Sequence, residues 1–184
     1  MATESKSKYA ILGFLAMKPM TGYEIKNYIE NSLKYFWHES YGQIYPTLKK
    51  FVENNWANVV IDCDATTRMK KVYSITRTGI KELESWLKQE TASFVPRIEL
   101  LLKVYFGKFC DNSVLIEHLE REREKELELL KVYNHIKSTL EKKCHCDEAK
   151  YSLITLDYGL GLARFNINWI EKTINKLKEN HEKN

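Results

Sequence analysis

The sequence predicts a mainly α-helical protein with one short β-hairpin. Only 7 Gly and 3 Pro occur in 184 residues, whereas 29% of the residues are charged, and this composition is typical of helices rather than of turn-rich sandwiches or barrels. Hydrophobic residues make up 43% of the chain, enough for a buried core, and apolar side chains recur at helical spacing. The length fits one ordinary domain or two small ones.

Two helices are predicted in the first 30 residues. The stretch Tyr9 to Met17 is apolar almost all round, so a helix here needs burial on more than one side, and a partner subunit could supply the second side. Pro19 interrupts this pattern. The residues from Thr21 to Glu24 then have the form of a capping box, which predicts that a second helix begins there.

A third helix is predicted after the aromatic pair Phe36 and Trp37. The stretch Ser40 to Gln43 repeats the capping-box pattern and leads into apolar residues at helical spacing. Pro46 would fall in the second turn, where its ring and missing N–H disturb a helix. The helix therefore either begins nearer Tyr45 or bends at the proline.

A β-hairpin and a fourth helix follow. Ala57 to Ile61 and Lys71 to Ile75 have strand-like composition, and a polar connector joins them. Thr76 or Thr78 can then cap a helix. Helices, hairpin and helix in this order within about 90 residues predict a winged helix-turn-helix domain over residues 1–90.

Residues 91–184 are predicted to form a second, helical domain. A bend at Lys88 to Pro96 precedes a short helix, and a long charged helix runs from Ser113 to about Lys143. The short helix has one apolar face, formed by Ile98, Leu101, Leu102, Tyr105 and Phe109.

The last helix has the clearest periodicity in the chain. Its coiled-coil-like seam consists of Leu160, Ala163, Ile167, Ile170, Ile174 and Leu177. A second apolar stripe on an adjacent face consists of Tyr158, Leu162, Phe165 and Trp169. Because one neighbouring helix cannot cover both stripes, we expect the seam to mediate dimerisation. Packing within a single chain is the alternative.

Positive charge is concentrated near the predicted third helix and hairpin. The net charge of the chain is only +4, but seven basic and three acidic residues lie between Ser40 and Lys81. A polyanion is therefore a plausible partner for this region.

The sequence resembles the PadR family of transcriptional regulators. The matching segments cover the first 90 residues in order, and shorter ones follow near the end of the chain. They are Tyr9-Ala-Ile-Leu-Gly-Phe-Leu15, Thr21-Gly-Tyr-Glu-Ile25, Phe36-Trp37, Gln43-Ile-Tyr-Pro-Thr-Leu-Lys-Lys50, Tyr73-Ser-Ile-Thr76, Gly79, Leu83-Glu-Ser-Trp-Leu87, Leu156-Asp-Tyr-Gly-Leu160 and Trp169-Ile170. The resemblance implies a cytoplasmic homodimeric repressor that binds a near-palindromic operator and is released by a small, phenolic effector or by another signal.

The geometry of a helix in the major groove predicts which residues contact double-stranded DNA. The first turns of the third helix present Ser40, Tyr41, Gln43 and Tyr45 to base edges. Phosphate contacts are expected from Thr21, Lys49, Lys50, Arg68, Lys70 and Lys71. The alternative roles are capping for Thr21 and Ser40, packing for Tyr45, and a solvated surface for the lysines. The tip of the hairpin, Asp64 to Lys70, departs from the family pattern, because it lacks the Gly that the family often has there.

Aromatic residues suggest a pocket for a planar effector. The candidates are Phe36, Trp37, Phe106, Phe165 and Trp169. Ordinary core packing is the alternative for each of them. Cys144, His145 and Cys146 suggest metal or redox sensing, but three ligands so close in sequence form an incomplete zinc site, and a solvent-exposed loop is the simpler interpretation.

Several other functional classes find little support in the sequence. No phosphate-binding Gly loop, nucleophile elbow or zincin helix occurs, so we expect no enzyme activity, no cofactor and no bound metal. No apolar run approaches the roughly 18 residues of a membrane span. Glu4 and the lack of a cleavage pattern argue against a signal peptide, and four cysteines are too few for a disulfide framework. A winged-helix module that binds proteins without specific DNA binding is the alternative function.

Overall fold

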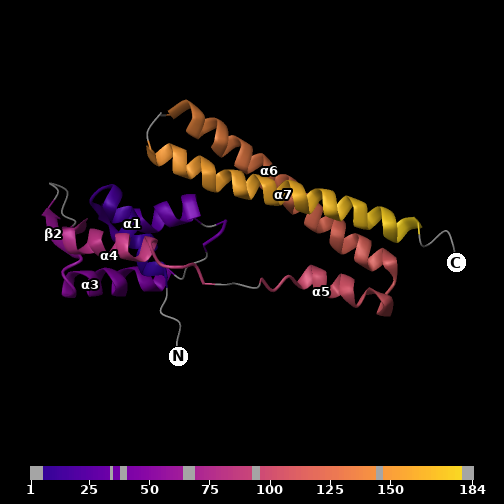
Figure 1. Cartoon of the computed structure of the whole chain (residues 1–184), viewed down its shortest axis with the longest axis horizontal. Helices are drawn as coiled ribbons and strands as arrows, with labels where there is room; N and C mark the ends of the chain where they lie inside the picture. The colour runs from indigo at the N-terminus through magenta and orange to yellow at the C-terminus, as the bar shows by residue number, and fades with distance from the viewer. Residues whose placement is uncertain are drawn as a thin grey trace. The chain divides into compact units, whose positions relative to one another are not determined.

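The chain divides into two compact units. The computed structural model describes residues 6–33, 35–37, 41–63, 69–92, 96–143 and 147–179. Contacts between residues separate Met1–Ser93 from Phe94–Asn184, and Figure 1 shows the helices of each unit. Within the described residues, no helix is both long enough and apolar enough to cross a bilayer.

The first unit combines four α-helices with a three-stranded antiparallel sheet. The helices are α1 (Ser7–Met17), α2 (Gly22–Tyr28), α3 (Ile44–Glu53) and α4 (Arg77–Leu87). The strands are β1 (Met20–Thr21), β2 (Ala57–Cys63) and β3 (Met69–Ile75), in the order β1-β3-β2. This arrangement confirms the predicted winged helix-turn-helix, with β2 and β3 as its wing. The two-residue strand β1 was not predicted, because so short a segment has no detectable period.

Short irregular helices join α2 to α3. A π-helical segment, Ile29–Leu33, continues α2, and a 3₁₀ turn, Tyr41–Gln43, precedes α3. Because α3 begins at Ile44, Pro46 falls within its first turn, where a helix does not need the missing N–H. The late start of the helix is therefore the correct alternative of the two predicted for Pro46.

The core of the first unit gathers residues from every helix and strand. Its fully buried members include Ile11, Leu12, Leu15, Met20, Ile25, Ile44, Leu48 and Phe51. The Tyr9 ring stacks on Trp86 of α4 with centroids 4.4 Å apart, and the Tyr9 hydroxyl donates to Glu82 at 3.1 Å. Helix α4 thus covers a second side of α1 within the same chain.

The second unit is built on a helical hairpin. It contains α5 (Glu99–Tyr105), a 3₁₀ turn (Gly107–Phe109), α6 (Asn112–Lys143) and α7 (Asp147–Glu179), and α6 and α7 lie side by side (Figure 1). Polar contacts fix their register: the amide nitrogen of Asn166 donates to Glu126 at 2.8 Å, and Lys137 bonds to Asp157 at 2.9 Å.

The structure corrects the dimerisation role predicted for the seam of the last helix. Leu160, Ala163 and Ile170 are each 1% exposed and Ile174 is 7% exposed within the single chain. Ile170 and Ile174 form a cluster with Leu119 of α6, and Leu177 packs against that cluster, while Ile167 is half-buried. The seam is therefore an intrachain contact with α6. A heptad pattern specifies a helical neighbour but not the chain that supplies it.

The apolar face predicted for the short helix is exposed, and its other side packs into the unit. Leu100 and Val104 pack against the Leu119 cluster. The predicted face is instead exposed, with Ile98 at 49%, Leu101 at 45%, Leu102 at 59%, Tyr105 at 81% and Phe109 at 75%. Almost every position of this helix is apolar, so its sequence period could not identify the buried side.

Helices α6 and α7 approach closely at Gly159. A Cβ atom at this glycine would lie 2.9 Å from Cε2 of Tyr133, whose side chain is 5% exposed. At Gly161, two residues further along α7, a Cβ atom would meet nothing within 4 Å. The two glycines therefore form a matched pair for testing this contact.

We expect Gly159→Ala to destabilise the protein and Gly161→Ala to stabilise it. The first change overpacks against a buried ring, at a cost of about 1–3 kcal/mol. The second only improves helix propensity, by up to about 1 kcal/mol. Urea unfolding of the two variants measures the difference, and equal free energies of unfolding would contradict the close packing.

Candidate nucleic-acid interface

Helix α3 has one buried face and one exposed face. Ile44, Leu48 and Phe51 are at most 2% exposed and anchor the helix in the core. The opposite face presents a different set of side chains to solvent, namely Gln43 at the helix start, Tyr45, Pro46, Lys49, Lys50 and Glu53. The predicted contacts Gln43, Tyr45, Lys49 and Lys50 thus share an accessible surface.

Tyr45 lies against the start of α2. A Cβ atom built at Gly22 would be 2.6 Å from Cε1 of the Tyr45 ring, yet this ring remains 62% exposed. Tyr73 of β3 lies nearby: burial raises the pKa of its hydroxyl, and the Tyr45 phenol raises it further. Tyr45 therefore sits where α2, α3 and the sheet meet.

Thr21 and Glu24 form the predicted capping box at the start of α2. The backbone N–H of Glu24 donates to Thr21 Oγ1 at 3.2 Å, and the backbone N–H of Thr21 donates to Glu24 Oε2 at 2.7 Å. The Thr21 hydroxyl also donates to that carboxylate oxygen at 2.8 Å. The capping role is confirmed, and a phosphate contact by Thr21 stays a prediction.

The capping box lowers the pKa of the Glu24 carboxyl group. Hydrogen bonds from the backbone and hydroxyl of Thr21 lower the pKa of Glu24, partial burial opposes this effect, and the charges of Lys18 and Lys70 lower the pKa slightly more. Glu24 is therefore within electrostatic reach of the wing.

The wing presents two of the predicted phosphate contacts. Lys70 and Lys71 are exposed on β3, opposite Asp62 and Ile61 of β2. Lys70 is thus paired across the hairpin with the acidic residue Asp62, whereas Lys71 is paired with the exposed apolar residue Ile61. The predicted contacts Ser40 and Arg68 and the side chain of Tyr41 lie outside the described residues.

Tyr23 is an accessible residue that the sequence interpretation missed. It occupies the second position of α2 and is 64% exposed. The first helix of a helix-turn-helix crosses the DNA backbone, so a phenol at its start is suited to a phosphate contact. The capping box could have identified this position, because it places Tyr23 in the first turn of the helix.

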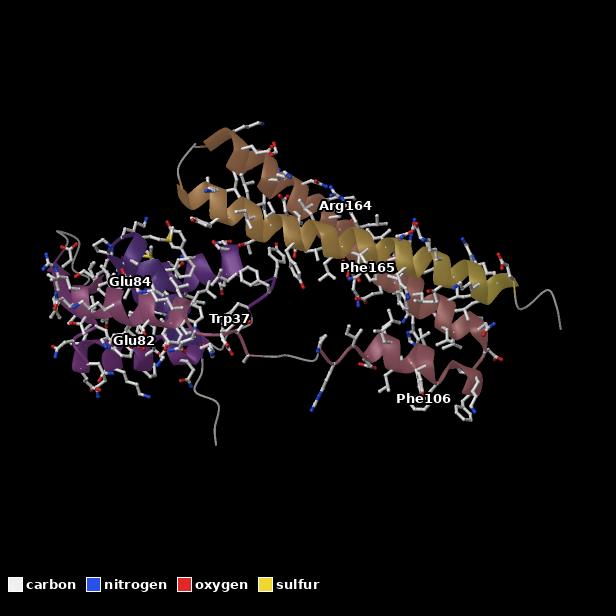
Figure 2. The ribbon with its side chains drawn as sticks, viewed as in Figure 1. Trp37, Glu82, Glu84, Phe106, Arg164 and Phe165 are labelled. Atoms are coloured by element: carbon white, nitrogen blue, oxygen red, sulfur yellow. The ribbon has the colours of Figure 1, made fainter. Side chains whose placement is uncertain are left out.

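The predicted effector residues divide between the two units. Phe36 is 55% exposed and Trp37 half-buried in the first unit, whereas Phe106 and Phe165 are 51% and 63% exposed in the second (Figure 2). Trp169 packs against the Leu119 cluster, which fits the core alternative. Their role in effector binding stays a prediction.

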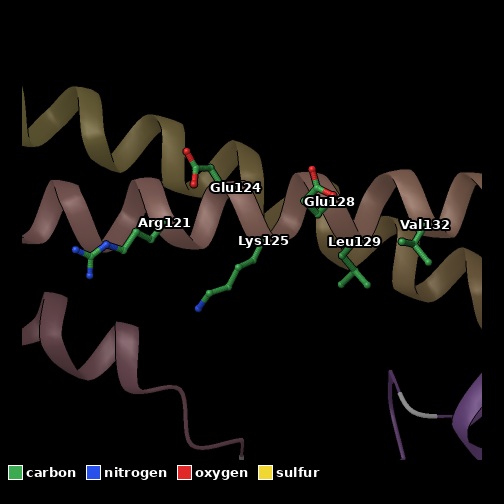
Figure 3. Close-up of a pocket in the computed structure, with 6 residues that line it drawn as sticks. All are labelled: Arg121, Glu124, Lys125, Glu128, Leu129 and Val132. Carbon is green, nitrogen blue, oxygen red and sulfur yellow. The ribbon is translucent and has the colours of Figure 1, made fainter.

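An open hollow lies on α6. It measures about 650 Å³, and its lining consists of four charged side chains followed along the helix by two apolar ones (Figure 3). The lining residues are Arg121, Glu124, Lys125, Glu128, Leu129 and Val132. None of the five aromatic candidates lines this hollow, which therefore gives them no shared pocket.

The structure places no metal site within its described part. No group of three His, Cys, Asp or Glu residues there is arranged to hold an ion. The candidates Cys144, His145 and Cys146 lie outside that part.

A second apolar stripe runs along α7 on the side away from α6. We call it the outer stripe, and it consists of Tyr151, Ile154, Tyr158, Leu162 and Phe165, which are 46–71% exposed. The spacing of three or four residues keeps these side chains on one face. Helix α7 is therefore apolar on two opposite sides, only one of which α6 covers.

The order of elements, the exposed face of α3 and the basic wing define a winged helix-turn-helix protein of the DNA-binding class. The model of the transcriptional regulator PadR-like family matches residues 11–85, and the model of the virulence activator alpha C-terminal region matches residues 96–178. Residues 11–85 thus belong to the PadR-like family of transcriptional regulators.

Relatives match this chain over nearly its whole length. The negative transcriptional regulator PadR of Bacillus subtilis (strain 168) is 26% identical over 172 residues, which cover 91% of this chain and 94% of that protein. The crystal structure of Bacillus subtilis PadR in complex with operator DNA has a TM-score of 0.85 at 25% identity and covers 94% of this chain and 99% of that chain. The structure of the same protein with p-coumaric acid shares the fold, with a TM-score of 0.78 at 24% identity over 93% of this chain and 98% of that chain.

We expect the charge of Glu24 to stabilise the fold only above acidic pH. Its folded-state pKa is lower than the usual value of 4.5, so the stabilisation is present above that pH and disappears as the pH falls through the folded-state value. Glu24→Gln should cost about 0.5 kcal/mol at pH 7 and nothing near pH 2. Unfolding of both proteins by urea across this range tests the effect, with Glu53→Gln as the control. A cost independent of pH would contradict it.

Proposed function

We propose that this chain is a repressor that binds operator DNA as a homodimer in the cytoplasm and is released by a small phenolic effector. The observation that carries the proposal is the exposed face of α3, together with the exposed lysines of the wing in the same unit. Membership of residues 11–85 in the PadR-like family supports it, as does the similarity to a relative whose structure contains operator DNA. As part of this proposal, residues 1–90 bind DNA and residues 91–184 mediate dimerisation and effector response.

Base recognition is assigned to the start of α3. Gln43 is exposed at the N-cap of α3 and makes no side-chain capping hydrogen bond, so its amide can pair with an adenine edge. Tyr45, two residues after Gln43, is also exposed. Ser40 and Tyr41 belong to the same proposed set, because they precede α3 in sequence.

Phosphate contacts are assigned to the flanks of this surface. Lys50 is exposed on α3, and Lys49 forms a long 3.8 Å ion pair with Glu53 that a phosphate can replace. Lys70 and Lys71 supply charge from the wing, with Arg68 and Thr21 as further proposed contacts. Such contacts set the affinity and its salt dependence but carry little sequence information.

We expect the double change Lys70→Ala with Lys71→Ala to weaken DNA binding at all sequences. The slope of log affinity against log salt concentration should flatten by about one to two units, because fewer counterions are released. Titration of a duplex selected from a random pool by the wild-type protein, at several salt concentrations, measures this slope. Lys131→Ala with Lys172→Ala, a change of equal charge on the second unit, is the control.

The result of this titration also tests the function itself. An unchanged slope in the wing variant would remove the wing from the mechanism. If the wild-type protein bound no duplex even at low salt, the repressor proposal would fail and the protein-interaction module would be favoured.

Dimerisation is assigned to the outer stripe of α7 in place of the seam predicted from the sequence. Five neighbouring apolar side chains, 46–71% exposed, make a surface whose burial is favourable by roughly 25 cal/mol per Å². A second copy is the fitting occupant, because a near-palindromic operator needs two reading helices related by twofold symmetry. The exposed face of α5 supplies further apolar surface in the same unit.

We expect Tyr158→Glu to convert the dimer to monomers without loss of helix content. A carboxylate in the middle of the outer stripe would be buried and unpaired in the dimer, which costs several kcal/mol. Sedimentation equilibrium and far-UV circular dichroism give the two readouts. Arg164→Glu, an exposed position beside the stripe (Figure 2), is the control and should remain dimeric. A wild-type protein of single-chain mass would contradict the assignment.

The effector is assigned to the phenolic acids. The supporting observations are the structural relative that contains p-coumaric acid and the aromatic candidates Phe36, Trp37, Phe106 and Phe165, each at least partly accessible here. A planar ring is the feature of these acids that such aromatic side chains recognise.

We expect p-coumaric acid to weaken binding of the selected duplex and to change tryptophan fluorescence. An effector releases DNA only if it binds the DNA-free state more tightly than the bound state. Titration of the complex with p-coumaric acid measures this, and hexanoic acid, which lacks the ring, is the control compound. If a panel of phenolic acids changed neither signal, this class of effector would be excluded.

A further inference from the structure

The reading surface contains an unusually close contact between a glycine of one helix and a tyrosine of the next. Gly22 is the first residue of α2, directly after Thr21, the N-cap of that helix. Atoms Cε1, Cζ and Cδ1 of the Tyr45 ring lie 2.6, 3.1 and 3.2 Å from the place where a Cβ atom of residue 22 would be. Gly22 is buried, and the ring covers it.

The contact between Gly22 and Tyr45 lies outside the hydrophobic core of the first unit. Tyr45 is 62% exposed, whereas the core side chains of α3 are almost completely buried. Neither residue belongs to the hydrophobic cluster of the first unit or to the partly buried side chains around it. An exposed aromatic ring normally samples several rotamers, and here the surface of α2 removes some of that freedom.

We propose, on the basis of the function assigned above, that Gly22 is a positioning residue for DNA recognition: its lack of a side chain lets the Tyr45 ring lie against α2, which presents the phenol to DNA in one orientation. The contact joins the start of the first helix of the motif to the start of the reading helix. It therefore fixes the reading tyrosine relative to an element that approaches the DNA backbone.

The surroundings of Tyr45 agree with this role. Tyr45 raises the pKa of Tyr73, so its phenol is within electrostatic reach of β3 of the wing. A preorganised side chain loses less conformational entropy when DNA binds, so a fixed phenol contributes more affinity than a mobile one.

The substitution Gly22→Ala should affect DNA binding but not the stability of the fold. The added methyl group meets the ring of an exposed side chain, which can swing away into solvent, so we expect the thermal unfolding midpoint to change little. DNA binding should weaken about tenfold, the effect of losing one well-placed contact. Gly13→Ala in α1 is the control, because a Cβ atom there meets nothing within 4 Å.

A double-mutant cycle shows whether Gly22 acts through Tyr45. Affinities for the duplex selected by the wild-type protein are measured for Gly22→Ala, Tyr45→Ala and the double variant. If the proposal is correct, Gly22→Ala has no further effect in the Tyr45→Ala background. An equal loss in both backgrounds would overturn it.

A measurement without DNA distinguishes failure of this proposal from failure of the proposed function. In the full-length protein, nuclear Overhauser contacts between the Gly22 α-protons and the Tyr45 ring should be strong, and Gly22→Ala should abolish the ordered ring position. Absence of these contacts in the wild type would overturn the positioning role even if DNA binds. Presence of the contacts with no binding of the wild type to any duplex would overturn the proposed function, and the positioning role with it.

Discussion

Burial of one face of α3 is the constraint on which the rest of the first unit depends. Ile44, Leu48 and Phe51 pack into the core with almost no exposed surface, and this burial determines which side of the helix faces outward. A rotation of α3 by one residue, about 100°, would bury Tyr45 or Lys49 and expose a core side chain. Loss of the three apolar contacts would cost several kcal/mol, so the reading face is fixed by hydrophobic packing and not by polar contacts.

A comparable constraint acts on the second unit, where α7 has two opposite apolar sides. The side formed by Leu160, Ala163 and Ile170 is completed by α6 of the same chain. Polar contacts from Glu126 to Asn166 and from Lys137 to Asp157 add specificity to that pairing, because a shift of register would break them. The outer stripe is consequently free of any role in holding the hairpin together.

Much of the first unit was predictable from the sequence because its elements carry local signals. The Thr21 capping box, the Thr76 cap and the strand composition on both sides of the wing each depend on residues a few positions apart. Two alternatives at Pro46 could not be separated in this way, since the 3₁₀ turn before α3 leaves no distinctive pattern. The second unit was harder: the period of α7 predicted two apolar faces, but it placed them on adjacent sides of the helix and assigned the seam to the wrong partner. Which helix covers which face depends on contacts between residues far apart in sequence, and periodicity contains no information about them.

The candidate site was predictable in its residue types but not in its geometry. Exposure of Gln43, Tyr45, Lys49 and Lys50 follows from the helical period, whereas the contact between Tyr45 and Gly22 follows from the packing of α2 against α3.

Charged side chains and hydrogen-bonding side chains of this surface contribute to the binding energy in different ways. Lysines at the edges of the surface act through charge and tolerate small displacements, because electrostatic attraction falls off slowly over the Debye length of about 8–10 Å. A hydrogen bond from a tyrosine or glutamine weakens steeply once the distance and angle depart from their narrow range. Sequence discrimination in a surface of this composition therefore depends on the few side chains whose position the neighbouring backbone restricts, and the surrounding lysines supply affinity that any duplex can use.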